Sequence, residues 1–114
     1  MHEYSLVEAL ISRVEAEAKK RQALAVHGLS VRVGELAGVD PELFQTAYDT
    51  FRAGTICAKA PLTMTRIAAS WTCPQCKTAI VRGEVLRCLA CGVPAKLDEG
   101  SDALTLDGID LEIP

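Results

Sequence analysis

The sequence lacks the features that would place it in a membrane, outside the cell or on nucleic acid. No apolar run in its 114 residues approaches the ~18 residues of a membrane-spanning helix, and the N-terminus lacks the basic start of a secretory signal. We therefore expect a cytoplasmic protein without membrane insertion. Positive charge is also scarce, because the chain has 12 Lys and Arg residues but 15 Asp and Glu residues. That balance argues against a protein held mainly by phosphate contacts.

Recognisable catalytic motifs are missing as well. The sequence has no glycine-rich phosphate-binding loop and no nucleophile and base at a familiar spacing. It also has no low-complexity linker that would separate large domains. The length suits one compact domain that carries a small module. We expect a protein that is not an enzyme.

Cysteine, in contrast, is abundant for so short a chain. Four of the five cysteines form the pairs Cys73-x2-Cys76 and Cys88-x2-Cys91, and Cys57 stands apart as a predicted buried thiol. Two such turns can aim four sulfurs at one ion, and four thiolates satisfy tetrahedral zinc. A site with four protein ligands has no open position for water or substrate, so we expect the zinc to be structural.

Other interpretations of the cysteine segment stay open at this point. An iron site or two redox pairs would use the same thiols. Residues 70–100 contain four cationic and three acidic side chains, and no aromatic residue follows Trp71. That pattern is poor support for nucleic-acid binding, which favours basic surfaces with stacking groups. A zinc-ribbon module that binds protein or nucleic acid remains the alternative function.

Periodicity predicts two helices and several strands around the cysteine segment. Apolar residues at three- to four-residue spacing predict a first helix that ends near Gln22, with Ser5 as its N-cap and residues 1–4 outside it. Asp40 and the proline after it start a second helix, which Gly54 ends. Alternating apolar and polar residues predict strands over 29–34 and 62–67 and, within 104–113, a strand pair or one irregular strand.

Together these elements predict an α+β fold, with two helices on one face of a small three-stranded sheet. Residues 1–70 and 94–114 form this domain. Residues 71–93 form an inserted four-cysteine zinc ribbon, which protrudes from one end. A polar loop is expected over 96–102.

Histidine is scarce, but one of the two histidines is residue 2. The terminal amine, the backbone nitrogen of His2 and its imidazole can close adjacent chelate rings around one ion. Glu3 can add a backbone nitrogen or a carboxylate oxygen. Such nitrogen-rich, square-planar geometry favours Ni(II) or Cu(II) over zinc. A lone terminal histidine is more often incidental, so both interpretations of His2 stay open, and His27 is expected in a loop or on the surface.

Taken in order along the whole chain, these motifs resemble the HypA/HybF family of hydrogenase nickel-incorporation proteins. The resemblance rests on Met-His-Glu at position one combined with the distal cysteine pairs. Further matching segments are Ser5-Leu6, Val33-Gly34-Glu35-Leu36, Gly54-Thr55 and the closing Leu104-x-Leu106-x2-Ile109-x-Leu111-Glu112-Ile113.

The resemblance implies a small nickel metallochaperone with a separate structural zinc ribbon. Members of that family cooperate with the GTPase HypB to load nickel into the large subunit of [NiFe]-hydrogenase. Carried over by motif, His2 is implied as the main nickel ligand, with Glu3 and the N-terminal backbone assisting. A nucleic-acid partner is not expected, and a homodimer is left open. The implied zinc ligands are Cys73, Cys76, Cys88 and Cys91.

Overall fold

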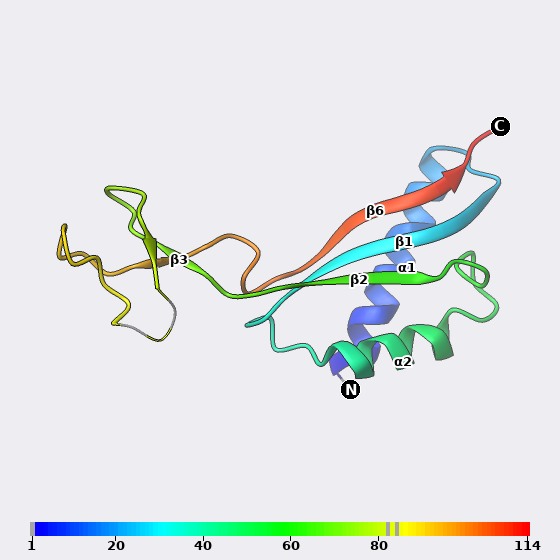
Figure 1. The fold of residues 1–114 in the computed structure, drawn as a ribbon. Helices are drawn as coiled ribbons and strands as arrows, with labels where there is room; N and C mark the ends of the chain where they lie inside the picture. The colour runs from blue at the N-terminus through cyan, green and yellow to red at the C-terminus, as the bar shows by residue number, and fades with distance from the viewer. Residues whose placement is uncertain (1, 82, 84) are drawn as a thin grey trace.

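The computed structural model describes residues 2–81, 83 and 85–114, and His2 through its backbone only. Two helices cover one face of a three-stranded sheet, and two extended segments lead from that sheet to a small second sheet (Figure 1). The molecule is elongated, with extents of 54 × 30 × 17 Å. The predicted α+β fold with a protruding cysteine module is confirmed. Within the described residues, no helix is long and apolar enough to cross a membrane.

The large sheet has the order β2-β1-β6, and the small sheet has the order β4-β3-β5. β1 runs parallel to β2 and antiparallel to β6, so α2 forms the crossover between the two parallel strands. The elements are α1 (His2–Lys20), β1 (Ala25–Gly34), α2 (Pro41–Phe51), β2 (Leu62–Ile67), β3 (Trp71–Thr72), β4 (Ala79–Ile80), β5 (Lys96–Leu97) and β6 (Leu104–Glu112).

The first helix begins earlier than the sequence predicts. α1 starts at His2, so the prediction that residues 1–4 precede a Ser5 cap is wrong for residues 2–4. Packing explains the difference, because the rings of Tyr4 and Phe51 meet edge to face with centroids 4.9 Å apart. This contact stabilises a first turn that carries Glu3, an acid that suits the positive end of a helix.

The second helix begins as predicted. The carboxylate of Asp40 accepts hydrogen bonds from the backbone N–H groups of Glu42 and Leu43, at 3.0 and 3.2 Å. Pro41 occupies the first turn, where its missing N–H costs nothing. After Phe51, Gly54 adopts a left-handed φ of 76°, a conformation that favours glycine.

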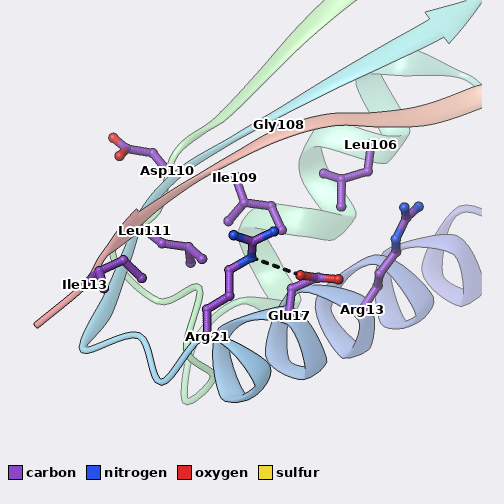
Figure 2. Close-up of a pocket in the computed structure, with 9 residues that line it drawn as sticks. All are labelled: Arg13, Glu17, Arg21, Leu106, Gly108, Ile109, Asp110, Leu111 and Ile113. Carbon is purple, nitrogen blue, oxygen red and sulfur yellow. Dashed lines mark hydrogen bonds and ion pairs between the residues drawn. The ribbon is translucent and has the colours of Figure 1, made fainter.

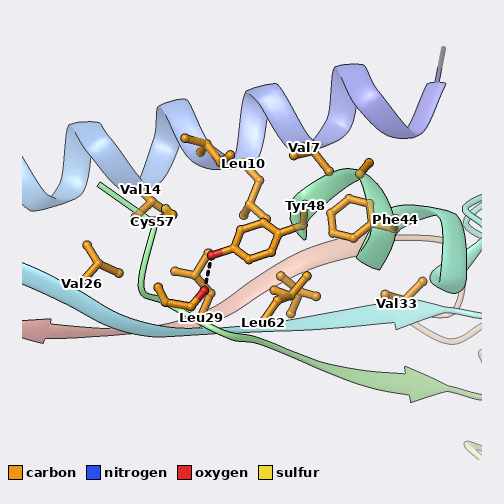
Figure 3. Packing of buried hydrophobic residues seen from close by; sticks show 14 of the residues in the cluster. Val7, Leu10, Val14, Val26, Leu29, Val33, Phe44, Tyr48, Cys57 and Leu62 are labelled. Atoms are coloured by element: carbon orange, nitrogen blue, oxygen red, sulfur yellow. Dashed lines mark hydrogen bonds between the residues drawn. The ribbon is translucent and has the colours of Figure 1, made fainter. Parts of the chain in front are cut away.

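The hydrophobic core lies between the helices and the large sheet (Figure 3). The hydroxyl of the fully buried Tyr48 donates to the carbonyl of Ala60 at 2.6 Å, and burial raises the pKa of this phenol above its usual value. The predicted isolated thiol, Cys57, is also fully buried, and burial raises its pKa. Other core residues are Val7, Leu10, Ile11, Val14, Ala18, Val26, Leu29, Val31, Val33, Phe44, Ala47 and Leu62.

β6 is one strand with an irregularity, which settles the choice that the sequence left open. Ser30 pairs with Gly108 and Val31 pairs with Leu106, so Asp107 is an extra residue in β6. A second register shift makes His27 an extra residue in β1. The side chain of His27 is about half exposed, which agrees with the surface position expected for it.

The two sheets are joined by a tightly packed junction. A Cβ on Gly34 would lie 2.2 Å from the carbonyl oxygen of Gly100 and 2.5 Å from the carbonyl carbon of Ser101, far inside contact distance. The buried hydroxyl of Ser101 accepts from the N–H of Ser70 at 3.3 Å. These contacts hold the segments that enter and leave the cysteine module against the end of β1.

The small sheet reaches further along the sequence than the loop predicted over 96–102. Lys96 and Leu97 pair with β3, so the loop prediction is wrong for these two residues. The carboxylate of Asp98 anchors the pairing, because it accepts from the hydroxyls of Ser70 at 2.5 Å and Thr72 at 2.7 Å. The same two hydrogen bonds lower the pKa of Asp98. These partners lie 28 and 26 residues away in the sequence, beyond any local pattern.

Gly34→Ala is expected to lower the free energy of unfolding by about 1–3 kcal/mol, because the added methyl group overlaps the backbone of the junction. The measurement is urea denaturation of the purified protein. Gly108→Ala is the matched control, since a Cβ there meets nothing within 4 Å. Equal denaturation midpoints for the two variants would contradict a tightly packed junction.

Candidate metal centre

The structure brings the four predicted cysteines together at the end of the molecule that lies away from the helices. The sulfurs of Cys73, Cys76, Cys88 and Cys91 all lie within 4.8 Å of one another, and the Cys76 and Cys88 sulfurs are 3.7 Å apart. Four sulfurs at tetrahedral zinc, each at about 2.3 Å, are separated by about 3.8 Å. The donor set and its spacing therefore fit zinc.

Each cysteine pair sits on a tight turn, and the two turns have the same hydrogen-bond pattern. In the first turn, the N–H of Lys77 donates to the carbonyl of Cys73 at 3.0 Å, and the N–H of Cys76 points at the Cys73 sulfur at 3.5 Å. Lys77 has a left-handed φ of 63°. This conformation turns the chain back so that Cys73 can also donate its N–H to the Thr78 carbonyl, at 2.9 Å.

The second turn repeats this geometry. The N–H of Gly92 donates to the carbonyl of Cys88 at 2.8 Å, and the N–H of Cys91 points at the Cys88 sulfur at 3.4 Å. Gly92 has a φ of 72° at the position that matches Lys77. Backbone N–H groups aimed at sulfur stabilise the thiolate form, which is the form that binds metal.

The thiols are electrostatically coupled. Hydrogen bonding with Thr78 lowers the pKa of Cys76 to about 6, whereas the contact with Cys76 raises the pKa of Cys91 to about 12. Thiolates this close repel one another, so all four ionise together only when a cation shares the site. Thr78 is a functional residue that the cysteine pattern alone does not indicate, although a hydroxyl two residues after a ligand cysteine is a readable signal.

The module that holds this cluster has little core of its own. Among its described residues, three strands are two residues long each, and the fully buried positions include Cys73 itself. A metal bound by side chains of both turns would replace the apolar core that so small a segment lacks. Such a site is structural and not catalytic, because the protein supplies all four ligands and leaves no open position on the metal.

The predicted nickel ligands lie apart from the cysteines. α1 begins within the domain that carries both helices, whereas the cysteine module forms the opposite end of the molecule (Figure 1). Glu3 is half-buried in the first turn of α1. His2 contributes the first backbone position of α1, and its side chain, like Met1, lies outside the described residues.

The fold and the cysteine cluster define a small α+β metal-binding protein with a separate metal module. A family model described as "Hydrogenase/urease nickel incorporation, metallochaperone, hypA" matches residues 1–111. The chain therefore belongs to the HypA family. It is a nickel metallochaperone of hydrogenase maturation, a carrier of metal and not an enzyme.

Relatives match over most of their length. The chain is 41% identical to the hydrogenase maturation factor HypA of Shewanella oneidensis over 92 residues, which are 80% of this chain and 78% of that protein. It is 32% identical to the HypA of Aquifex aeolicus over an alignment of 115 positions, which covers 99% of each chain. These matches include proteins of closely similar length.

Solved structures agree with the fold. The solution structure of the Ni metallochaperone HypA from Helicobacter pylori superposes with a TM-score of 0.72 at 27% identity, covering 98% of each chain. A second solution structure of a HypA protein gives a TM-score of 0.79 at 28% identity, covering 100% of this chain and 98% of that one. Both superpositions cover the helical domain and the cysteine module together.

Proposed function

We propose that this protein binds Ni(II) through His2, Glu3 and the N-terminal backbone, and delivers it to the large subunit of [NiFe]-hydrogenase with the GTPase HypB as second partner. The observation that carries this proposal is the family match, which begins at residue 1 and so includes the Met-His-Glu start. Zinc held by the four cysteines is the resident metal, and nickel is the cargo.

The start of α1 supports nickel binding by the backbone. The first N–H groups of an α-helix have no acceptor within the helix, and α1 begins at His2. The backbone nitrogens of His2 and Glu3 are therefore not needed for helical hydrogen bonds, and they can bind a metal instead. The positive end of the helix opposes a bound cation, and the Glu3 carboxylate in the first turn offsets that effect.

The geometry of the cysteines supports zinc in the module, which we propose as a ribbon over 71–93 inserted into a nickel domain formed by 1–70 and 94–114. A zinc ion with four thiolates carries net negative charge. Residues 71–93 contain three cations and one acid, and this positive excess offsets the charge of the cluster. The nickel site gains its selectivity from a different donor set, rich in nitrogen.

The metal content of the untagged protein tests this proposal. We expect about one equivalent of zinc to persist through dialysis, and about one equivalent of Ni(II) to bind in a subsequent titration. Both metals are quantified by plasma mass spectrometry. Zinc without nickel uptake would overturn the chaperone proposal and favour a ribbon that serves protein interaction.

An N-terminal tag is expected to weaken Ni(II) binding by about tenfold or more, because the terminal amine leaves the chelate and a ring is lost. Zinc content stays unchanged, since the cysteines lie at the far end of the molecule. The same tag after Pro114 is the matched control and leaves nickel binding intact. Titrations of the two tagged proteins that coincide would contradict a ligand role for the amine.

A further inference from the structure

The outer edge of β6 is unpaired. β6 is the last strand in the order β2-β1-β6, so the backbone groups on its far side have no strand partner among the described residues. The strand is nine residues long. A free edge of this length is a template for an extended backbone, because its N–H and C=O groups can continue the ladder.

A groove runs between this edge and α1, with a volume of about 600 Å³. Figure 2 shows the apolar side chains of β6 pointing into the groove toward the helix, whereas Asp110 points to the other side of the sheet. The groove therefore offers an apolar floor beside a free strand edge. The floor residues are Leu106, Ile109, Leu111 and Ile113.

The helical wall of the groove is positively charged. Arg13 and Glu17 on α1, and Arg21 directly after its end, follow one another at four-residue spacing and face the strand (Figure 2). Glu17 pairs with Arg21 at 3.3 Å, whereas Arg13 is exposed and has no ion-pair partner within the described part of the chain. The wall therefore carries a net charge of +1 on a chain whose net charge is −3, and the charge left over beside the Glu17–Arg21 pair is that of Arg13.

We propose that this groove binds an extended, acidic segment of a partner protein, which adds to β6 as a fourth strand. Its backbone continues the sheet, and its alternate side chains face the groove. Apolar side chains of the segment pack on the floor, and its carboxylates reach Arg13 and Arg21. The proposal goes beyond metal binding, and it rests on the proposed function only for the choice of partners to test.

A second copy of this chain is a poorer occupant of the groove. Antiparallel pairing of two β6 edges about a two-fold axis would bring the two α1 helices together with opposite directions. Around an axis at the middle of the groove, Glu17 would face its own copy and Arg13 would face the Arg21 of the other copy. Like charges placed near one another oppose that arrangement, whereas an acidic segment satisfies both arginines.

The test uses the intact, zinc-loaded protein and two purified probes, the GTPase HypB and the hydrogenase large-subunit precursor of the same organism. Arg13→Glu reverses the unpaired cation of the wall, and Ile113→Asp removes exposed apolar floor just beyond the end of β6. Each change is expected to weaken binding of one probe by about tenfold or more in calorimetric titrations. Lys19→Glu makes the same charge reversal on α1 outside the groove, and stays within about twofold of the unmodified protein.

Strand addition has a second signature, which a purely electrostatic contact would lack. On binding of the probe, hydrogen–deuterium exchange should slow along 104–112, because outward N–H groups of β6 gain acceptors. Unchanged affinity of both probes for the Arg13→Glu and Ile113→Asp variants, or unchanged exchange along β6, would overturn the proposal. A dimer of the protein alone that these variants dissociate would overturn it in favour of a second copy.

Failure of the groove is distinguishable from failure of the nickel proposal. Arg13 and Ile113 belong to neither proposed metal site, so these variants are expected to keep the nickel and zinc content of the unmodified protein. A protein that takes up no nickel but still loses affinity for a probe with Arg13→Glu would refute the cargo while supporting the groove. Normal nickel uptake with unaltered partner binding would support the nickel cargo and refute the groove.

Discussion

His2→Ala is expected to abolish Ni(II) uptake while zinc content and the melting temperature stay unchanged. The imidazole binds the ion without deprotonation of an amide, and it closes one of the two adjacent chelate rings. Without the imidazole, only the terminal amine, the backbone nitrogens and the Glu3 carboxylate remain to displace water from the ion. Alanine favours helix, so the first turn of α1 persists in the variant.

The control for this prediction is the second histidine. His27 lies on β1, where its ring nitrogen Nε2 is 2.9 Å from the Glu112 carboxylate. His27→Ala removes the same side chain from the surface and is expected to bind nickel like the unmodified protein. Calorimetric titration with Ni(II) compares the two variants. Nickel isotherms that are equal for His2→Ala and His27→Ala would refute the ligand role of His2.

Glu3 can be separated from His2 in the same experiment. Glu3→Gln keeps the backbone nitrogen and removes only the carboxylate charge, so a smaller loss of nickel affinity is expected than for His2→Ala. An equal loss in both variants would place the carboxylate among the primary ligands. The comparison therefore tells which atom of residue 3 contributes.

The second large effect is expected from Cys73→Ala, which should strongly lower zinc content and unfold the cysteine module. Cys73 is fully buried, and its sulfur accepts the N–H of Cys76. Its loss leaves three thiolates and an open coordination position. Binding energy at structural zinc sites is folding energy, about 10–16 kcal/mol in small zinc peptides, so a weakened site releases both metal and structure.

The helical domain should survive this change. Its core between the helices and the large sheet contains none of the four clustered cysteines. Helical circular dichroism is therefore expected to persist, while the fluorescence of Trp71, on β3 of the small sheet, reports the loss of module structure. Full zinc retention with unaltered melting would contradict the assignment of four thiolate ligands.

Cys57→Ala provides the matched control. Cys57 is buried in the main core, among residues of both helices and the large sheet. Its replacement removes one core atom and is expected to cost about 1 kcal/mol of unfolding free energy, with zinc content unchanged. Zinc loss from this variant would show that the two halves of the molecule are coupled.

Much of this molecule follows from local sequence patterns. The second helix could be predicted because Asp40, Pro41 and the apolar stripe act within a few residues of one another. The cysteine site could be predicted for the same reason, since each Cys-x2-Cys turn is a local structure that carries two ligands. Both predictions required only spacing along the chain.

Other features escaped prediction because they depend on contacts between distant segments. The early start of α1 depends on Tyr4 meeting Phe51, which belongs to the other helix. The pairing of β5 depends on Asp98, whose hydroxyl partners precede it by more than twenty residues. Periodicity cannot register such contacts, because it compares only neighbours in sequence.

The sequence by itself therefore determined the types of the two helices and the three long strands, the four-sulfur cluster and the resemblance to nickel chaperones, because each is encoded in residue types at short spacing. Only the tertiary structure decided which edge of the sheet stays open and that Arg13 and Arg21 face the apolar side of β6. Strand order and the packing of a helix over a sheet arise from burial of the whole core, and a surface groove exists only once that core has formed.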